Sequence, residues 1–382
     1  MFIKRWAYKL LSSAGVIINP ATEDAQTDNT QTTQITNSDG VKANVHDGLL
    51  HVASAGHCIG EGLIPLHKPW VKFGYNPVIT NTEEVIWSEG GSYTWPTAEM
   101  GMEIVSDDNT QDIGTQLFAG TSDGGGLTTI IDSTKDFTAT AAVGDCVILD
   151  KSGTTPESGK VTAVGITTLT VAGGFSSGGT GDARDYIVLD SSAHTGAQAV
   201  YISYLDGDYA KHNEIVILNG TTEVPTVNLD LFRINGMKVV CAGSLHETLG
   251  DVSLRNLANT PIYAHITSGY TITRQALFTV PAGITLYVNS FSSAWCSPND
   301  SKVQSARVIL RANIDTENSF NVGDIFYPYF ELQVTNEDVN VSNSVPVRIP
   351  AKADVIVSAI ATDAAGSGPA TCVMRGWVAS GE

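Results

Sequence analysis

The sequence is poor in charged residues, and most of the charge it carries is negative. Only 16% of its 382 residues are Asp, Glu, Lys or Arg, whereas an average soluble protein has roughly 25%. Long solvated helices need charged outer faces, so this composition disfavours a helical protein. The 21 Lys and Arg are outnumbered by 40 Asp and Glu, which gives a formal net charge of −19. Such an acidic chain repels phosphates, so we expect no nucleic-acid partner.

Sequence features of membrane and nucleotide-binding proteins are also missing. No apolar run reaches the roughly 18 residues of a membrane span, so we expect a soluble protein without a membrane partner. Near the N-terminus, Lys9 divides the apolar stretch that a secretory signal would need. Neither G-x-x-x-x-G-K nor a helix-opening G-x-G-x-x-G motif is present, so no nucleotide cofactor is expected.

The five cysteines are widely spaced and odd in number. None of them forms a C-x-x-C pair, which disfavours a zinc ribbon and a dense disulfide scaffold. We therefore expect free thiols at all five positions: Cys58, Cys146, Cys241, Cys296 and Cys372.

The N-terminal residues differ from the rest of the chain in charge. Apolar residues at near-helical spacing alternate with Lys4, Arg5 and Lys9, which predicts a short amphipathic helix over residues 2–12. The segment is either a frayed terminus or a peg that docks on another protein. In the second case the docking residues are Phe2, Lys4, Arg5, Trp6 and Tyr8. Residues 19–44 are polar and aperiodic, which predicts an extended arm or linker.

From about residue 45 the chain consists of short β-rich runs separated by turn residues. Asn219-Gly220 and Asn235-Gly236 each stand between two such runs and are suited to tight hairpin turns. Frequent strands without a helical stretch predict an all-β protein of antiparallel sandwich or jelly-roll domains. Further strands are predicted over residues 198–204, 283–288, 307–310, 329–334, 345–349 and 354–358.

Residues 116–195 differ in composition from their surroundings, because they begin and end in glycine-rich stretches and contain a hairpin pattern around Gly165. An exposed loop accepts an insertion whose ends lie close together, so we predict a small β module inserted into a host domain. The predicted division is an N-terminal helix and arm (1–44), a β domain (45–115 plus 196–250), the inserted module (116–195) and a C-terminal β-sandwich (251–382).

Three groups of residues are candidates for metal binding. His46, His51, His57, Cys58 and His67 lie close in sequence, but their spacing matches no standard zinc site and loop histidines are common. The acidic groups lack the glycine and glutamate of a calcium loop, and turn residues that bond their own backbone are the favoured interpretation. These groups are Asp107, Asp108 and Asp112, and Asp206, Asp208 and Glu214.

No catalytic residues can be assigned. Residues 120–124 match G-x-S-x-G around Ser122, but the motif works only where a helix follows, and no helical pattern does. Two carboxylates suffice for glycoside cleavage, yet nothing selects a pair among the acidic residues. Aromatic residues could stack on sugars, although core positions are favoured: Trp70, Trp87, Tyr93 and Trp95. We predict a protein that is not an enzyme and has no metal or cofactor.

Several segments, taken in order, resemble a family of structural proteins from tailed-bacteriophage virions. They cover much of residues 78–115 and 196–382, and no catalytic residue is carried over with them. In such relatives the parts on either side of residues 116–195 run on directly, which agrees with an insertion. The segments are 78–96 (VITNTEEVIWSEGGSYTWP), 196–206 (GAQAVYISYLD), 214–224 (EIVILNGTTEV), 232–237 (FRINGM), 270–274 (YTITR), 278–283 (FTVPAG) and 351–355 (AKADV).

Two shorter stretches also resemble phage proteins. Residues 19–23 (NPATE) are similar to a motif common in phage virion proteins, and residues 132–171 are similar to a small β module found in several of them. The resemblance implies a homotrimeric, non-enzymatic capsid decoration or head or tail fibre on the virion surface, with other virion proteins as partners. Two alternatives are a tail or baseplate protein that recognises host glycans and a polysaccharide-degrading tailspike.

Overall fold

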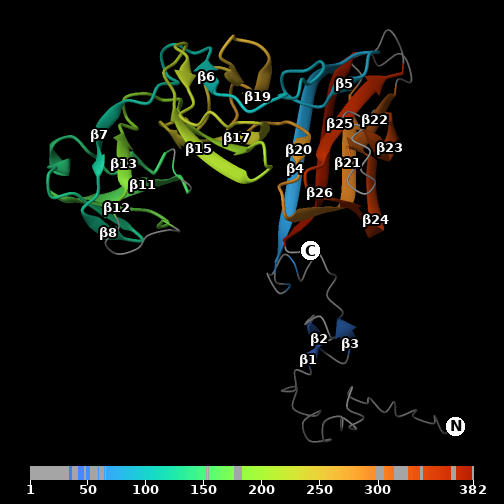
Figure 1. Cartoon of the computed structure of the whole chain (residues 1–382), viewed down its shortest axis with the longest axis horizontal. Coiled ribbons are helices and arrows are strands. Elements are labelled where there is room, and N and C mark those ends of the chain that lie inside the picture. Colours follow the sequence, from blue (N-terminus) through green and yellow to red (C-terminus); the bar gives the residue numbers. More distant parts are fainter. Residues whose placement is uncertain are drawn as a thin grey trace, which may run out of the picture. The chain divides into compact units, whose positions relative to one another are not determined.

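Figure 1 shows the chain as a computed structural model whose assigned helices and strands are almost all strands. The structure describes residues 34–36, 42–46, 49–51, 59, 64, 66–151, 153, 155–175, 183–296, 305–313, 326–335, 339–362 and 367–380. Within these ranges the one helical element with assigned bounds is the 3-10 helix η1 (Phe137–Ala139). The defined strand pairs are antiparallel. The prediction of an all-β, antiparallel protein is therefore confirmed.

The chain divides into two units, residues 1–69 and 70–382. In the first unit three short strands form one sheet: β1 (Gln34–Thr36), β2 (Lys42–His46) and β3 (Leu49–His51). β1 and the first three residues of β2 fall within residues 19–44 and are paired in a sheet, so the prediction of an extended arm is wrong there. Ile35 and Val45 are β-branched residues that favour strands, despite the polar composition around them. The predicted helix over residues 2–12 lies outside the described residues.

Two sheets in the second unit enclose one hydrophobic core, and we call them the C-terminal sheet pair. The first runs in the order β24-β21-β26-β4, and the second in the order β20-β25-β22-β23 with β5 also paired to β25. The bounds are β4 (His67–Ile79), β5 (Glu84–Val85), β20 (Leu277–Thr279), β21 (Ile284–Trp295), β22 (Ala306–Ala312), β23 (Tyr327–Val334), β24 (Val339–Ile349), β25 (Asp354–Ala361) and β26 (Gly368–Ser380).

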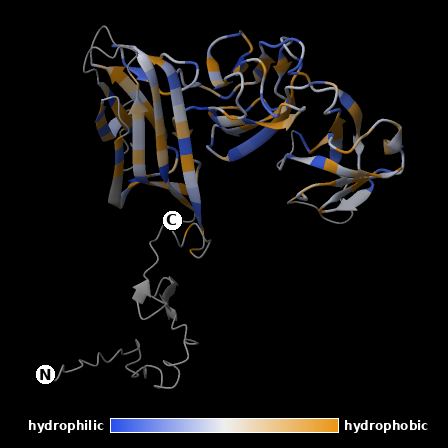
Figure 2. Cartoon of the chain, turned by 180° about the vertical axis from the view of Figure 1, so that it is seen from behind, coloured by the Kyte–Doolittle hydropathy of each residue, from blue (hydrophilic) through white to orange (hydrophobic). Residues whose placement is uncertain are grey.

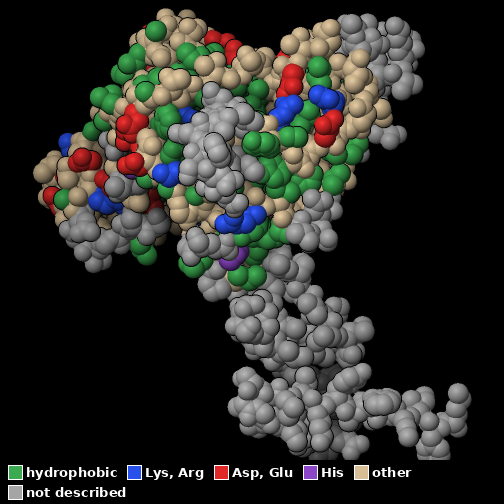
Figure 3. Space-filling model, turned by 45° about the vertical axis from the view of Figure 1, so that its right-hand side comes forward, with side chains coloured by type: hydrophobic (Ala, Val, Ile, Leu, Met, Phe, Trp, Pro, Cys, Tyr) green, Lys and Arg blue, Asp and Glu red, His purple; other side chains and the backbone are tan. Residues whose placement is uncertain are grey.

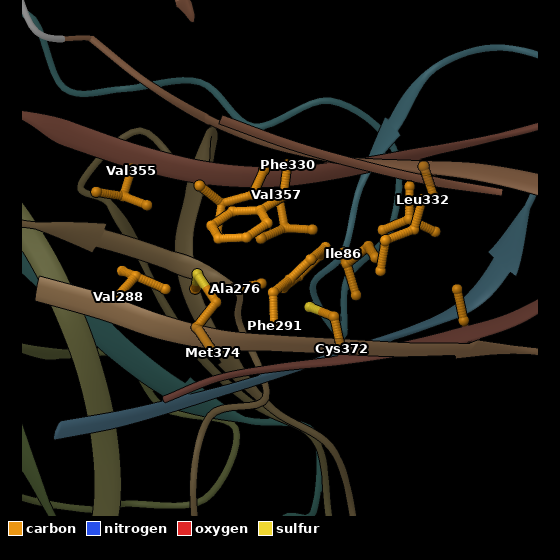
Figure 4. Packing of buried hydrophobic residues seen from close by; sticks show 14 of the residues in the cluster. Ile86, Ala276, Val288, Phe291, Phe330, Leu332, Val355, Val357, Cys372 and Met374 are labelled. Carbon is orange, nitrogen blue, oxygen red and sulfur yellow. The ribbon is translucent and has the colours of Figure 1, made fainter. Parts of the chain in front are cut away.

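The core of this sheet pair follows from the alternation of side chains along its strands. Apolar residues recur at every second position, which directs them to one face of each sheet, and Figure 2 shows the resulting bands of hydrophobic and hydrophilic residues. In Figure 4, Phe291 and Met374 of one sheet point toward Phe330 and Val357 of the other. The ring centroids of Phe291 and Phe330 are 5.9 Å apart.

Two further sheets share a second core and form what we call the middle domain. Their orders are β15-β14-β17 and β16-β6-β18-β19. Apolar residues of both sheets, such as Ile202 and Leu254, are fully buried between them. The bounds are β6 (Met102–Ser106), β14 (Ala197–Leu205), β15 (Lys211–Ile217), β16 (Val224–Pro225), β17 (Arg233–Ala242), β18 (Val252–Asn256) and β19 (Ile262–Ile266).

A seven-stranded sheet with its own core spans the residues predicted as an inserted module, and we keep that name for it. Its order is β7-β13-β10-β11-β12-β9-β8. Phe137 and Tyr186 are among the side chains of its core. The bounds are β7 (Gln116–Thr121), β8 (Gly124–Gly126), β9 (Thr129–Ile131), β10 (Cys146–Leu149), β11 (Glu157–Val164), β12 (Thr168–Val171) and β13 (Asp185–Leu189).

The chain enters and leaves the inserted module at the same place. The amide of Asp190 donates to the carbonyl of Thr115 at 2.8 Å, and the amide of Ala197 donates to the Asp112 carboxylate at 2.9 Å. Close ends of this kind let a host domain accept an insertion without a change in its own strands.

The structure differs from the predicted domain boundaries in three places. β2 crosses the predicted boundary between residues 44 and 45, and with β3 it belongs to the first unit. β4 and β5 belong to the C-terminal sheet pair, although they were expected in the domain formed by residues 45–115 and 196–250. β18 and β19 belong to the middle domain, although they lie within the predicted C-terminal range 251–382. Sheet membership depends on pairings between distant segments, and local composition does not encode those pairings.

The three predicted turns have different outcomes. β11 and β12 form the hairpin around Gly165, as predicted. Asn219-Gly220 makes a turn in which Gly220 has φ +60, but β15 pairs with β14 and β16 pairs with β6, so the predicted hairpin is wrong. Asn235-Gly236 lies inside β17, where the register shifts opposite Ser203 and Tyr204. Gly236 has φ +147, and glycine suits such a backbone conformation in a bulge as well as in a turn. The Asn-Gly pair therefore predicted a hairpin turn where the chain forms a bulge.

A buried ion pair links the middle domain to the C-terminal sheet pair. Arg233 of β17 reaches both carboxylate oxygens of Asp354 in β25, at 3.1 to 3.3 Å. Arg233 also donates to the carbonyl of Pro96 at 2.7 Å, and Thr279 donates its hydroxyl proton to Asp354.

In the described part of the chain, no helix is long and apolar enough to cross a membrane.

Candidate functional site

An open groove of about 600 Å³ lies between the inserted module and the middle domain. One wall comes from the module, where Ser158 and Lys160 of β11 stand beside Ser191 and Ser192, which follow β13. Lys160 lies opposite Cys146 in the pairing of β10 with β11. This wall therefore carries three hydroxyl groups and one ammonium group.

The other wall belongs to the middle domain. It is formed by the end of β17 and the turn after it, together with Thr271, whose carbonyl accepts from the amide of Val239 at 2.7 Å. Ser244 and His246 in that turn are exposed. Val239, Val240 and the two bonded cysteines supply apolar surface, so polar groups flank an apolar surface in the groove.

A disulfide between Cys146 and Cys241 joins the two walls. The Cα atoms are 5.8 Å apart, and the two residues are 95 positions apart in the sequence. The prediction of free thiols is therefore wrong for this pair. It is confirmed for Cys372, which is a free thiol, and Cys296 forms no disulfide with a described cysteine, whereas Cys58 lies outside the described residues.

The disulfide pairing follows from the alternation of side chains in β10. All four residues of this strand are buried, because both of its faces are covered. Val147 and Leu149 enter the core of the inserted module. Cys146 and Ile148 point to the opposite face, where they pack against the middle domain in a second cluster with Leu189, Ala199, Ile215 and Cys241.

Main-chain hydrogen bonds hold both walls in place. The amide of Ile215 in the middle domain donates to the carbonyl of Lys151 in the module at 2.7 Å. In the turn after β17, the amide of Gly243 donates to the carbonyl of Gly196 at 2.8 Å, and that of Leu245 donates to Thr195 at 3.0 Å. A Cβ atom at Gly243 would lie 1.8 Å from the carbonyl oxygen of His194, so only glycine permits this approach.

The polar groups of the groove divide into those with partners and those without. Ser191 donates its hydroxyl proton to the carbonyl of Gly144 at 2.9 Å, and Ser192 donates its own to Asp190 at 2.7 Å. Among the described residues, no side-chain hydrogen bond or ion pair engages the remaining polar groups, which could therefore bind a ligand: Ser158, Lys160, Ser244, His246 and Thr271.

Sequence motifs do not reveal this groove. Its walls lie far apart in the sequence, and neither wall contains a recognised motif. The one available signal was the cysteine pattern, because Cys146 lies in the predicted module and Cys241 lies in the predicted host domain. A disulfide between a module and its host would have placed β10 beside β17.

The predicted docking residues lie outside the described residues: Phe2, Lys4, Arg5, Trp6 and Tyr8. Of the candidate zinc ligands, His46 is in β2, His51 is in β3 and His67 begins β4, whereas His57 and Cys58 are outside the described ranges. Among the described residues, no three histidine, cysteine or carboxylate side chains are grouped so that they could hold a metal ion.

Asp108 binds the backbone of its own turn, as the turn interpretation predicts, but that interpretation is wrong for Asp112, which binds backbone amides of distant segments. Asp108 accepts hydrogen bonds from the amides of Thr110 and Gln111 at 2.8 and 2.5 Å. Partial burial acts to raise the pKa of Asp108, but these amide donors outweigh it and hold the pKa below its ordinary value. Asp112 is fully buried and accepts from Ser106 and from the amide of Gly250, at 2.7 and 2.9 Å.

The second acidic group is divided between two places. Asp206 accepts from the amides of Asp208 and Ala210, at 3.0 and 2.8 Å, and lies 2.8 Å from Nε2 of His212. Burial acts to raise the pKa of Asp206. Hydrogen bonds from His212 and from the two amides lower this pKa by more than burial raises it, so the net shift is downward. These contacts are again those of a turn.

Glu214 is buried and faces a different loop. It accepts from the amides of Val227 and Asn228 at 2.6 and 3.2 Å. Burial raises the pKa of Glu214 above its ordinary value, even though these hydrogen bonds act in the opposite direction.

Ser122 and the aromatic residues are structural. Ser122 lies between β7 and β8, so a strand follows it where a nucleophile would need a helix, and its hydroxyl accepts from the amide of Arg184 at 3.1 Å. Trp87 and Tyr93 are buried in one cluster, as the core interpretation predicts. Trp95 packs against this cluster, and Trp70 packs on Phe278 with ring centroids 5.1 Å apart.

Comparisons with family models, with curated proteins and with solved structures find no match.

Proposed function

We propose that the chain is a non-enzymatic structural component on the surface of a tailed-phage virion, a homotrimeric capsid decoration or a head or tail fibre. The N-terminal segment would anchor it to a neighbouring virion protein. The other domains would then face outward.

The observation that carries this proposal is the path of the chain through the C-terminal sheet pair. The chain passes from β4 in the first sheet to β20 in the second, back to β21 in the first and again to β22 in the second. It stays in the second sheet for β23. It then passes to β24 in the first sheet, β25 in the second and β26 in the first. β26 lies between β4 and β21, and β25 lies between β20 and β22. We therefore assign these eight strands to a jelly roll, an arrangement common in viral capsid proteins and lectins.

The positions of the resembling segments give further support. Residues 78–96 include the end of β4 and all of β5, and residues 278–283 and 351–355 meet β20 and β25. These segments therefore belong to the framework on either side of the inserted module. A family that lacks the module could keep the same framework.

The N-terminal anchor can be tested by deletion. A chain that lacks residues 1–44 should fold with the same near-ultraviolet circular dichroism and the same oligomeric state, yet be absent from purified particles. A second variant keeps the full length of the chain and replaces the five predicted docking residues with serine, and it should be lost from particles as well. These residues are Phe2, Lys4, Arg5, Trp6 and Tyr8. Normal occupancy of both variants would refute the anchor.

A receptor-binding protein for host glycans is the second candidate, and the open groove with unengaged polar groups is the observation that favours it. A glycan array separates the two functions, because a purely structural protein should bind no glycan. A third function, polysaccharide cleavage, predicts soluble oligosaccharides after incubation with host capsule or cell wall.

A further inference from the structure

We propose that the groove between the inserted module and the middle domain binds an acidic saccharide, in which one anionic group pairs with the Lys160 ammonium. This inference concerns a ligand of the isolated chain and does not depend on the location of the protein in a particle.

The first step is the charge of the groove. The chain as a whole carries −19, yet none of the described residues that line this groove is a carboxylate, and Lys160 and His246 are the ionisable side chains among them apart from the bonded cysteines. A lysine facing a site without carboxylates attracts anions, because no neighbour neutralises it.

The second step is the absence of a carboxylate partner. Lys160 shares this with the other described lysines, which form no ion pairs, and it differs in this from several arginines. Arg184, Arg255 and Arg311 each contact at least one carboxylate. On the face shown in Figure 3, several Lys and Arg side chains lie close to Asp and Glu, and one group of them lies apart from any acidic side chain. Lys160 has no such partner among the described residues, and it is exposed to incoming ligands.

The third step is the engagement of two carboxylates that are adjacent in sequence to residues of the groove. Asp145 is buried and accepts from the amides of Ala142 and Ser191, at 2.7 and 3.1 Å. Asp190 accepts from the amide and the hydroxyl of Ser192, at 2.8 and 2.7 Å. Both carboxylates thus accept hydrogen bonds from neighbouring amides, and in Asp190 also from a hydroxyl group, and neither forms an ion pair with Lys160.

The fourth step is the fit to a sugar. A saccharide ring has apolar C–H faces and a rim of hydroxyl groups. In the groove, Val239, Val240 and the disulfide offer apolar surface, and Ser158, Ser244 and Thr271 offer hydroxyl groups. The volume of about 600 Å³ lies within the roughly 300–1,000 Å³ of ligand sites. The main-chain hydrogen bonds of both walls keep the site formed before the ligand arrives.

The experiment measures binding to the purified full-length chain by saturation-transfer NMR and calorimetry. Two acidic probes are used, an oligogalacturonate with carboxylates and an oligomeric glycerol phosphate with phosphates, and they distinguish the two possible anionic groups. A neutral oligosaccharide of equal length and inorganic phosphate are the comparison probes. We expect at least one acidic probe to bind at least tenfold more tightly than both comparison probes.

Variants then locate the binding. Lys160→Met removes the ammonium from an exposed position and should weaken the acidic probe at least tenfold without a change in thermal stability. Lys151→Met is the matched control, because this exposed lysine of the same module does not line the groove. Ser244→Trp fills the groove without a change in charge and should also abolish binding.

Three results would overturn the proposal. The first is the absence of binding of either acidic probe at millimolar concentration. The second is equal affinity of an acidic probe and the neutral oligosaccharide. The third is unchanged affinity in both Lys160→Met and Ser244→Trp. If instead the chain binds acidic saccharides but is absent from virions, the virion role fails and this inference stands.

Discussion

Removal of one partner of the buried pair Arg233–Asp354 should destabilise the protein strongly. The side chains are 11% and 9% exposed, so neither charge is well solvated. Asp354→Ala leaves the guanidinium buried with only carbonyl acceptors, those of Pro96 and Phe232. Breaking a buried pair in this way costs about 3–5 kcal/mol. We expect Arg233→Met to cost a similar amount, because it leaves the Asp354 carboxylate buried.

The test is a double-mutant cycle in chemical denaturation at pH 7. Arg233→Met combined with Asp354→Leu removes both buried charges, so the double variant should lose less stability than the sum of the single losses. The control is Glu331→Gln, because Glu331 and Arg307 form a pair at 3.7 Å with side chains 53% and 44% exposed. Exposed pairs contribute about 0–1 kcal/mol. Strictly additive losses in the cycle, or an equal loss in Glu331→Gln, would refute the reasoning.

Three further predictions concern groups that are buried or half-buried. The double variant Cys146→Ser/Cys241→Ser should lower the free energy of unfolding by about 2–4 kcal/mol. A non-reducing peptide map of the native chain should contain the two peptides linked by this disulfide. Free thiols at both Cys146 and Cys241 would contradict the structure. Burial lowers the pKa of Lys72 from 10.5 to about 7, so the cost of burying its charge is full below pH 7 and is relieved as pH rises toward 10.5. The melting temperature of the native chain relative to Lys72→Met should therefore rise across that window, and a constant difference would exclude the shift. Asp112→Asn places an amide opposite amide donors, which should cost about 1–3 kcal/mol and expose neighbouring loops to proteolysis; an unchanged digestion pattern would argue against this role.

The sequence predicts the fold class and most strands because these depend on local patterns. β14, β22 and β25 all lie where apolar alternation or a continuous apolar run places them. The hairpin at Gly165 is likewise local, since it needs only a turn residue between two short strands.

Features that depend on distant segments could not be predicted. β4 and β5 precede the middle domain in sequence but pair with β26 and β25, which lie at the other end of the chain. Asn235-Gly236 fits a turn as well as a bulge, and only the continuous partner strand β14 distinguishes them. The groove depends on the approach of β10 to β17, which no local pattern encodes.

A cryo-electron reconstruction of purified particles tests the proposed function most directly. The account predicts threefold-symmetric density on the outside of the capsid or tail into which the C-terminal sheet pair fits, with the N-terminal segment in contact with a neighbouring virion protein. Particles that assemble with the gene intact but lack both this density and the peptides of the chain would contradict it.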